Sequence, residues 1–272
     1  MSAFHLARVS LIAAVAMTTP LPAQQIADRI AAVGSGAVTF HFAARPGVCG
    51  DGERFLRIGR RSYQGLSSAE TRSTPCDVGP VQVRLTVRDG SVERVETWAG
   101  PLRGRDAEDL GAVRATDAAR YLMNIASRSS SYASAKAILP AVLADSATVW
   151  PSLVIIARDT QGRSRATRQD AMFWLSQYAA GASAGQANSP FDNDEDDESG
   201  GEDLKTHAVF VLSQLPRGEG VESLLDVART NKDARVRSKA LFWLGQSGDP
   251  RALRLFESIL RGNVDSRLPV EH

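Results

Sequence analysis

The chain has 272 residues, of which 43% are hydrophobic, and its formal net charge is +1 at pH 7. This length predicts one or two domains with enough apolar residues to form a packed core. A charge so near zero argues against a general polyanion binder, because such proteins carry a clear excess of lysine and arginine.

Residues 1–23 are typical of a signal peptide. Arg8 supplies the positive charge, residues 9–17 form an apolar run too short to span a membrane, and cleavage is expected after Ala23. The alternative is that this segment forms a first core helix. No later stretch has about 18 consecutive apolar residues. We therefore predict an exported protein, periplasmic or extracellular, with no membrane span after signal removal.

Residues 34–100 contain segments in which apolar and polar residues alternate, as they do in β-strands. A strand is predicted at 37–44 and a weaker one at 55–59. Residues 81–100 predict a hairpin, because Asp89-Gly90 is a favoured two-residue turn. We expect an irregularity in the return strand between positions 92 and 95.

These patterns predict a small antiparallel β domain over 34–100. A short helix is expected before it at 24–33, and a polar linker after it at 101–115. A β unit of this size has little core, so it benefits from a covalent staple.

Cys49 and Cys76 are the only cysteines, and both lie in the β domain. In an exported chain this pattern predicts a structural disulfide. Closing such a loop contributes about 3 kcal/mol to stability through loop-closure entropy. A metal pair is the alternative, but two thiolates need two more ligands and nearby His41 supplies only one.

The second half of the chain repeats itself. One segment is written three times, as AMFWLSQ (171–177), AVFVLSQ (208–214) and ALFWLGQ (240–246). A second segment recurs as SLVIIAR (152–158) and SLLDVAR (223–229). Their apolar spacing predicts amphipathic helices in pairs, and such pairs bury their apolar stripes by stacking on further copies.

The last pair, residues 233–261, carries a family resemblance. Its residues at the characteristic positions are Asp233, Val236, Arg237, Ala240, Leu244, Gly245, Gly248, Asp249, Pro250 and Ala252. This pattern resembles the HEAT repeat, in the short bacterial variety also called phycobilisome-lyase-like. The resemblance covers about half of the chain. It implies a helical binding scaffold and no bilin chemistry.

The predicted fold class is therefore mainly α. It is an α-solenoid of about four HEAT-like hairpins over 116–262, preceded by the small disulfide-stapled antiparallel β unit. An acidic insertion at 181–203 interrupts the repeats, and a tail follows at 263–272.

Residues 192–203 of the insertion are strongly acidic. The acids at positions one, three and five of an EF-hand-like loop are Asp192, Asp194 and Asp196. Position six is Asp197 where glycine is needed, and position twelve is Asp203 where a bidentate glutamate is expected, so the geometry of a specific calcium site is not encoded. One hypothesis is that the acidic loop still binds cations weakly. A second hypothesis places the acids over the basic residues between 229 and 239.

No catalytic motif is present, and we predict no enzyme activity, no cofactor and no metal. The histidines of the mature chain are His41, His207 and His272, and none lies in a recognisable nucleophile–base arrangement. Arg57, Arg60 and Arg61 form a local basic cluster, which we interpret as a solvated face, with an anionic ligand site as the alternative.

One pattern goes beyond fold. At about 100° per residue, Phe242 and Gln246 lie about 200° and 240° from Ala240, away from the core side. The same spacing recurs in each copy, and the pairs are Phe173 and Gln177, Phe210 and Gln214, and Phe242 and Gln246. Stacked repeats would align them into a strip that either packs between repeats or binds a partner.

We therefore predict an exported, non-catalytic scaffold that binds a protein or peptide through its helical repeats, and no nucleic acid. The alternatives are a small-ligand or sensory module with recognition in the β unit, and an accessory subunit of an envelope enzyme.

Overall fold

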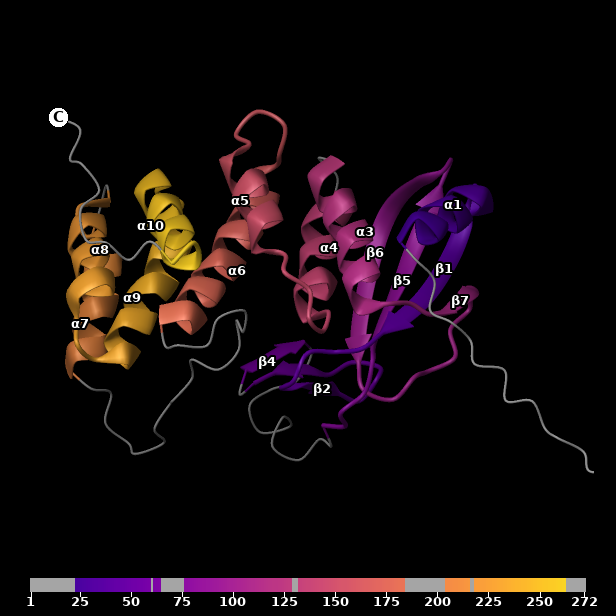
Figure 1. The fold of residues 1–272 in the computed structure, drawn as a ribbon, viewed down its shortest axis with the longest axis horizontal. Helices are drawn as coiled ribbons and strands as arrows, with labels where there is room; N and C mark the ends of the chain where they lie inside the picture. The colour runs from indigo at the N-terminus through magenta and orange to yellow at the C-terminus, as the bar shows by residue number, and fades with distance from the viewer. Residues whose placement is uncertain are drawn as a thin grey trace, which may run out of the picture.

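The computed structural model describes residues 23–59, 61–64, 76–128, 132–183, 204–215 and 218–262. A β-sheet lies at one end of an elongated molecule, and helices extend from it to the other end (Figure 1). The predicted signal peptide, the acidic segment 192–203 and the tail 263–272 lie outside the described residues.

A four-stranded sheet with the strand order β6-β5-β1-β7 is formed by the first half of the chain. Its strands are β1 (Gly36–Phe42), β5 (Val81–Arg88), β6 (Ser91–Ala99) and β7 (Glu108–Ala112). The alternating residues of β1 and β5 are buried, Val38, Phe40 and Phe42 among them. The helix expected before this sheet is present as α1 (Ala23–Val33).

The predicted hairpin is confirmed in detail. Asp89 and Gly90 form the turn with φ angles of 50° and 71°, as a type I′ turn requires. The pairing register shifts so that Val92 and Arg94 face neighbouring residues of β5 and Glu93 is the extra residue of a bulge. This bulge is the irregularity expected between positions 92 and 95.

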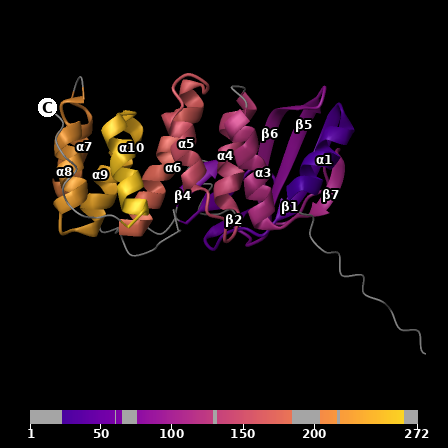
Figure 2. The ribbon, with the colours of Figure 1, turned by 45° about the horizontal axis from the view of Figure 1, so that its top comes forward.

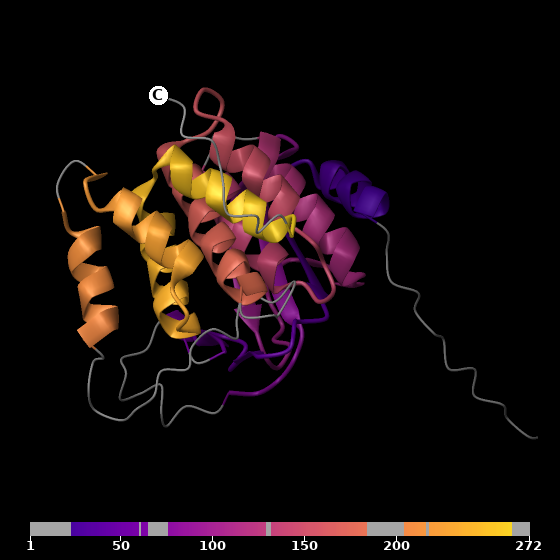
Figure 3. The same ribbon diagram turned by 60° about the vertical axis from the view of Figure 1, so that its left-hand side comes forward.

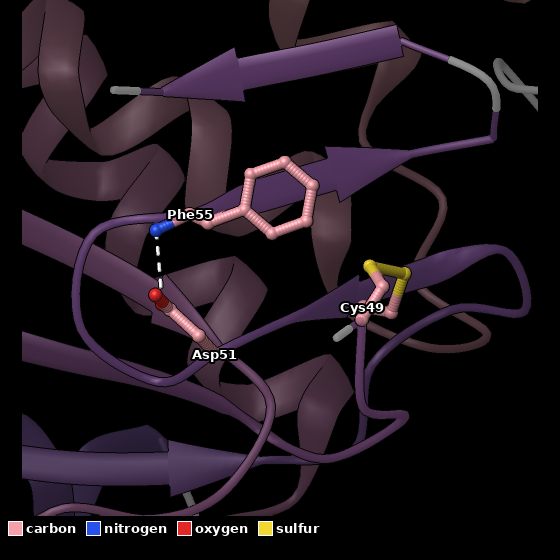
Figure 4. The surroundings of a disulfide bond; sticks show 4 residues. Cys49, Asp51 and Phe55 are labelled. Atoms are coloured by element: carbon pink, nitrogen blue, oxygen red, sulfur yellow. Dashed lines mark hydrogen bonds between the residues drawn. A yellow bond between two sulfur atoms is a disulfide. The ribbon is translucent and has the colours of Figure 1, made fainter. Parts of the chain in front are cut away.

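A smaller sheet follows β1 in the chain, with order β2-β3-β4. It consists of β2 (Val48–Gly50), β3 (Leu56–Ile58) and β4 (Arg61–Gln64). The predicted disulfide is confirmed: Cys49 of β2 is bonded to Cys76, with Cα atoms 5.2 Å apart (Figure 4). The bond therefore ties the small sheet to the segment that leads into β5.

Asp51 shapes the turn between β2 and β3. Its Oδ1 accepts the backbone N–H groups of Glu53, Arg54 and Phe55 at 2.8–2.9 Å, and Figure 4 shows the last of these bonds. Burial acts to raise the pKa of the Asp51 carboxyl, but these N–H donors outweigh it and hold the pKa below its ordinary value.

Three backbone segments cross beside the disulfide at distances that only glycine permits. A Cβ on Gly50 would lie 2.4 Å from the Ala99 carbonyl oxygen, and one on Gly100 would lie 2.3 Å from the Gly50 oxygen. A Cβ on Gly79 would lie 2.4 Å from the Gly100 oxygen. We call Gly50, Gly79 and Gly100 the glycine crossing, and it places the small sheet against the end of β6.

Helices make up the rest of the chain. They are α3 (Ala115–Arg128), α4 (Tyr132–Leu143), α5 (Trp150–Arg158), α6 (Arg165–Ser183), α7 (Leu204–Ser213), α8 (Val221–Thr230), α9 (Ala234–Ser247) and α10 (Pro250–Leu260). Both helices of the last pair have capped ends. Asp233 and Asp249 accept the N–H groups of Arg235 and Arg251, and Gly248 ends α9 in the left-handed region.

A buried arginine joins the two halves. The Arg45 backbone N–H donates to the Leu143 oxygen at 2.9 Å, and its Nε donates to the Val142 oxygen at 2.8 Å. Its Nη2 donates to the Ala147 oxygen, and its guanidinium lies 6.0 Å from the ring centre of Tyr178 in α6. Arg45 thus ties the chain after β1 to the α4–α5 connection and to α6.

The predicted fold class is wrong in its β part. The sheet is mixed and larger than a small antiparallel unit, because β7 pairs in parallel with β1. β7 comes from residues 101–115, which were expected to be a linker. In addition, α4 packs against β6 and β5, and α1 packs against β1 and α3. The sheet and the first helices therefore share one core.

The predicted solenoid is also wrong. In a solenoid the repeated helices stack in chain order, which would place α7 between α6 and α9. Instead α9 lies between α6 and α7 (Figures 1 and 2), and α10 lies against α6 and α9 (Figure 3). The last pair of helices is thus inserted between the two pairs that precede it in the chain.

A tight helix contact accounts for this order. Gly245 of α9 lies so close to α6 that a Cβ there would be 2.6 Å from the Ser176 side chain and 3.2 Å from the Met172 oxygen. Ser176 and Gly245 occupy the same position in AMFWLSQ and ALFWLGQ. Two small residues at matching positions let α6 and α9 approach closely and in register.

Candidate functional site

Aromatic side chains from α6, α9 and α7 form a continuous row across the helical end of the molecule. The rings of Phe173 and Phe242 are 6.4 Å apart and edge to face, and Trp174 lies 5.0 Å from Phe173. Trp243 lies 5.1 Å from Phe242 and 5.3 Å from Phe210. These are distances at which aromatic rings attract one another. We call these five residues the aromatic row.

The aromatic row becomes more exposed from α6 towards α7. Trp174 is buried, the next three residues are half-buried, and Phe210 is 37% exposed. Val211 of α7 is 48% exposed, and Leu215, two residues after the end of α7, is 40% exposed. The outer end of the row therefore belongs to an exposed apolar patch, a feature that marks interaction surfaces when apolar residues gather in one place.

Trp243 adds a polar group to the row. Its indole Nε1 is buried and has no hydrogen-bond acceptor among the described residues. Such an unmet donor costs about 1–3 kcal/mol.

The structure brings the predicted phenylalanines together but separates the glutamines. Phe173 lies beside Phe242, whereas Phe210 reaches Trp243, because α9 lies between α6 and α7. Gln177 is buried and its Nε2 donates to Ser176 Oγ, while Gln246 is exposed. Gln214 is also exposed and donates to Ser213 Oγ at 3.0 Å. The glutamines therefore form no common strip.

A groove of about 530 Å³ lies where the sheet meets the helices. One wall is β6, through Val95, Glu96, Thr97 and Trp98. The other wall is α4, through Tyr132, Ala135, Lys136 and Leu139, and α6 closes it with Asp170, Phe173 and Trp174. The aromatic row thus begins at this groove. Its volume is in the range of sites that enclose a small ligand or a short peptide segment.

Few of the charges in the groove are paired. Glu96 accepts from Arg84 Nη1 at 2.8 Å, and Lys136 Nζ lies 5.4 Å from the ring centre of Tyr132. Asp170 has no hydrogen bond or ion pair with any described residue. Although Asp170 is exposed as a residue, partial desolvation of its carboxyl raises the pKa, and the nearby Lys136 ammonium only partly offsets this. Asp170 is therefore a carboxyl group that would gain from a second cation.

Sequence reasoning missed the groove because it misread α4. A proline disfavours an uninterrupted helix, so the sequence did not define a helix around Pro140, yet α4 runs to Leu143 with Pro140 inside it. The missed signal is the spacing of Tyr132, Ala135, Lys136 and Leu139, which recurs every three or four residues and so defines one helix face. Trp98 at the end of a predicted strand was a second signal.

Several features singled out in the sequence lie wholly or partly outside the described residues. This is so for the calcium-like loop at 192–203 and for the side chains of Arg60, Arg61 and His207. His41 is half-buried in β1. Within the described residues, no group of three or more His, Cys, Asp or Glu side chains is placed to hold a metal ion.

A second hollow of about 430 Å³ lies between α3 and the start of α5. Its charged residue Arg120 donates to Asp117 at 3.2 Å. Its charged side chain is therefore already paired, whereas Asp170 in the groove at β6 has no such partner among the described residues.

Comparison of the chain with known protein families, with curated proteins and with solved structures found no match. The resemblance to HEAT repeats therefore stays a prediction that rests on the residues of the last helix pair. In the part of the chain that the structure describes, no helix is long and apolar enough to cross a membrane.

Proposed function

We propose that this protein is an exported, non-catalytic binding protein whose helical end holds a segment of a partner protein. The observation that carries the proposal is the aromatic row, which runs from the groove at β6 to the exposed apolar residues of α7. Aromatic side chains are enriched at protein interfaces and supply much of their binding energy.

A further observation supports this proposal. The Cys49–Cys76 disulfide supports export, because such bonds persist in oxidising compartments.

Photo-crosslinking in cells tests the proposal. We would place p-benzoylphenylalanine at position 210, at the exposed end of the row, and in a separate variant at position 155. Ile155 of α5 is 67% exposed and lies outside the row, so it is a matched control. We expect a discrete adduct with one protein from position 210 and none from position 155.

A loss-of-binding variant completes the test. The Phe210→Ser/Val211→Ser variant should lose the crosslinked partner in affinity capture and keep its melting temperature, since both side chains are exposed. Ile155→Ser should keep the partner. Equal adducts from both positions, or partner loss only in variants that unfold, would refute the proposal.

A further inference from the structure

The groove at β6 runs along the edge of the sheet. Successive side chains of a strand point to opposite faces of the sheet. The groove touches four consecutive residues, 95–98, so it reaches both faces, which is possible only along the edge of β6. In the described residues β6 pairs with β5 alone, and residues 95–98 make no backbone hydrogen bond on their other side.

An unpaired edge presents N–H and C=O groups that pair readily with another extended chain. The groove has room for one, because α4 forms its opposite wall and the volume between them is about 530 Å³. Four residues of strand span about 13 Å. A strand edge facing a helix across a groove is the arrangement in which extended peptides bind by strand addition.

The chemistry of the lining selects among peptides. Four aromatic rings line the groove, from Trp98, Tyr132, Phe173 and Trp174. Aromatic faces attract both apolar side chains and cations, and the Arg105 guanidinium already lies 3.4 Å from the ring centre of Trp98. The lining has two carboxylates against one ammonium, and of the two only Glu96 has an ion-pair partner, Arg84. A lysine or arginine placed near Asp170 would complement this lining.

We propose that the groove binds an extended peptide segment that adds to the free edge of β6 and places a basic side chain against Asp170. This inference rests on the proposed function and gives that function a position, a binding mode and a partner chemistry.

Selection from a library tests this proposal. A phage-displayed library of random linear seven-residue peptides would be selected on the immobilised full chain, and the strongest binder would be synthesised with capped ends. We expect the selected peptides to be enriched in lysine or arginine between apolar residues. A selection that yields no binder, or binders without basic residues, would overturn the proposal.

Two substitutions locate the binding site. Asp170→Asn should weaken binding of the synthetic peptide about tenfold, which corresponds to about 1.4 kcal/mol. Tyr132→Ala should also weaken it and should leave folding intact, since Tyr132 is 69% exposed. Ile155→Ala is the matched exposed control and should leave the affinity unchanged. Unchanged affinity in both groove variants would refute the assignment.

The binding mode has its own readout. N-methylation of alternate peptide amides should abolish binding in one of the two registers, and hydrogen exchange at residues 95–98 should slow when the unmodified peptide is bound. If the peptide instead loses affinity only in Phe210→Ser/Val211→Ser, strand addition at β6 is refuted and the proposed function survives at α7. If the peptide binds in the groove but position 210 gives no adduct, strand addition at β6 stands and the proposed binding at α7 is refuted.

Discussion

The sheet region and the helical end of this molecule are held together by different kinds of interaction. The sheet region has a disulfide, the glycine crossing and the backbone bonds made through Arg45. The helical end, from α6 to α10, has no disulfide. It is held by side-chain packing, tight at Gly245 and looser at Phe210, and by polar contacts such as Arg237 Nη2 donating to the Ser183 oxygen. Regions without a covalent cross-link open more readily, so we place partner binding where the molecule can adapt.

The largest expected effect comes from removing the staple. The Cys49→Ser/Cys76→Ser variant should lose about 3 kcal/mol of unfolding free energy, because the bond closes a loop between residues 27 positions apart. Urea unfolding measures the loss, and reduced wild type should match the variant. Hydrogen exchange should accelerate in β2 and β3 before it does in α9. Equal acceleration in both would show that the two regions open as one.

A substitution at the α6–α9 contact tests the other region. Gly245→Val should cost about 1–3 kcal/mol, because its side chain would overlap Ser176 and the Met172 oxygen. Gln246→Val is the control, since Gln246 is exposed on the same helix. Thermal melting followed by circular dichroism measures both. If the two variants melt alike, the contact is not what places α9 beside α6.

The smallest effect concerns the cap of α10. The pKa of Asp249 is lowered chiefly because the Arg251 side chain donates a hydrogen bond to its carboxylate. Burial acts to raise this pKa, and the hydrogen bond from the Arg251 backbone N–H acts to lower it further. A lowered folded-state pKa stabilises above the unfolded value of about 3.9 and loses this contribution as the pH falls through the folded value.

Asp249→Ala should therefore cost about 1 kcal/mol at pH 7, the usual value of a lost N-cap. The difference from wild type should shrink below about pH 4. Asp249→Asn keeps a capping oxygen and should cost less at neutral pH. Urea unfolding at several pH values measures the stability of all three proteins. If the difference in unfolding free energy between wild type and Asp249→Ala does not change with pH, the charge of Asp249 does not contribute to the cap.

Local signals explain which elements were predictable. The hairpin at 81–100 was predicted to its bulge because turn and alternation lie within one short segment. β7 was missed because residues 108–112 do not alternate clearly, and their pairing depends on β1, far away in the chain. Pro140 concealed α4, since a proline usually interrupts a helix.

The order of the helices could not be predicted for a different reason. Three nearly identical segments predict three similar helices but do not specify which two are neighbours. The choice depends on Gly245 fitting against Ser176, a contact that exists only after folding. The candidate site follows the same rule. The repeat predicts that its phenylalanines lie near one another, whereas the Phe173–Phe242 pair needs α9 beside α6, and the groove needs β6, α4 and α6 to be assembled.

The glycine crossing gives this chain a signature by which distant relatives can be found. Substituting any of its members would push apart backbone segments that a disulfide already joins, so selection for the fold should retain them together with the cysteines. A search for Cys49-Gly50, Cys76 followed by Gly79, and Gly100 at comparable spacings would detect descendants of the same ancestor after their helices have diverged. Sequences found in this way would show which groove residues evolution has retained.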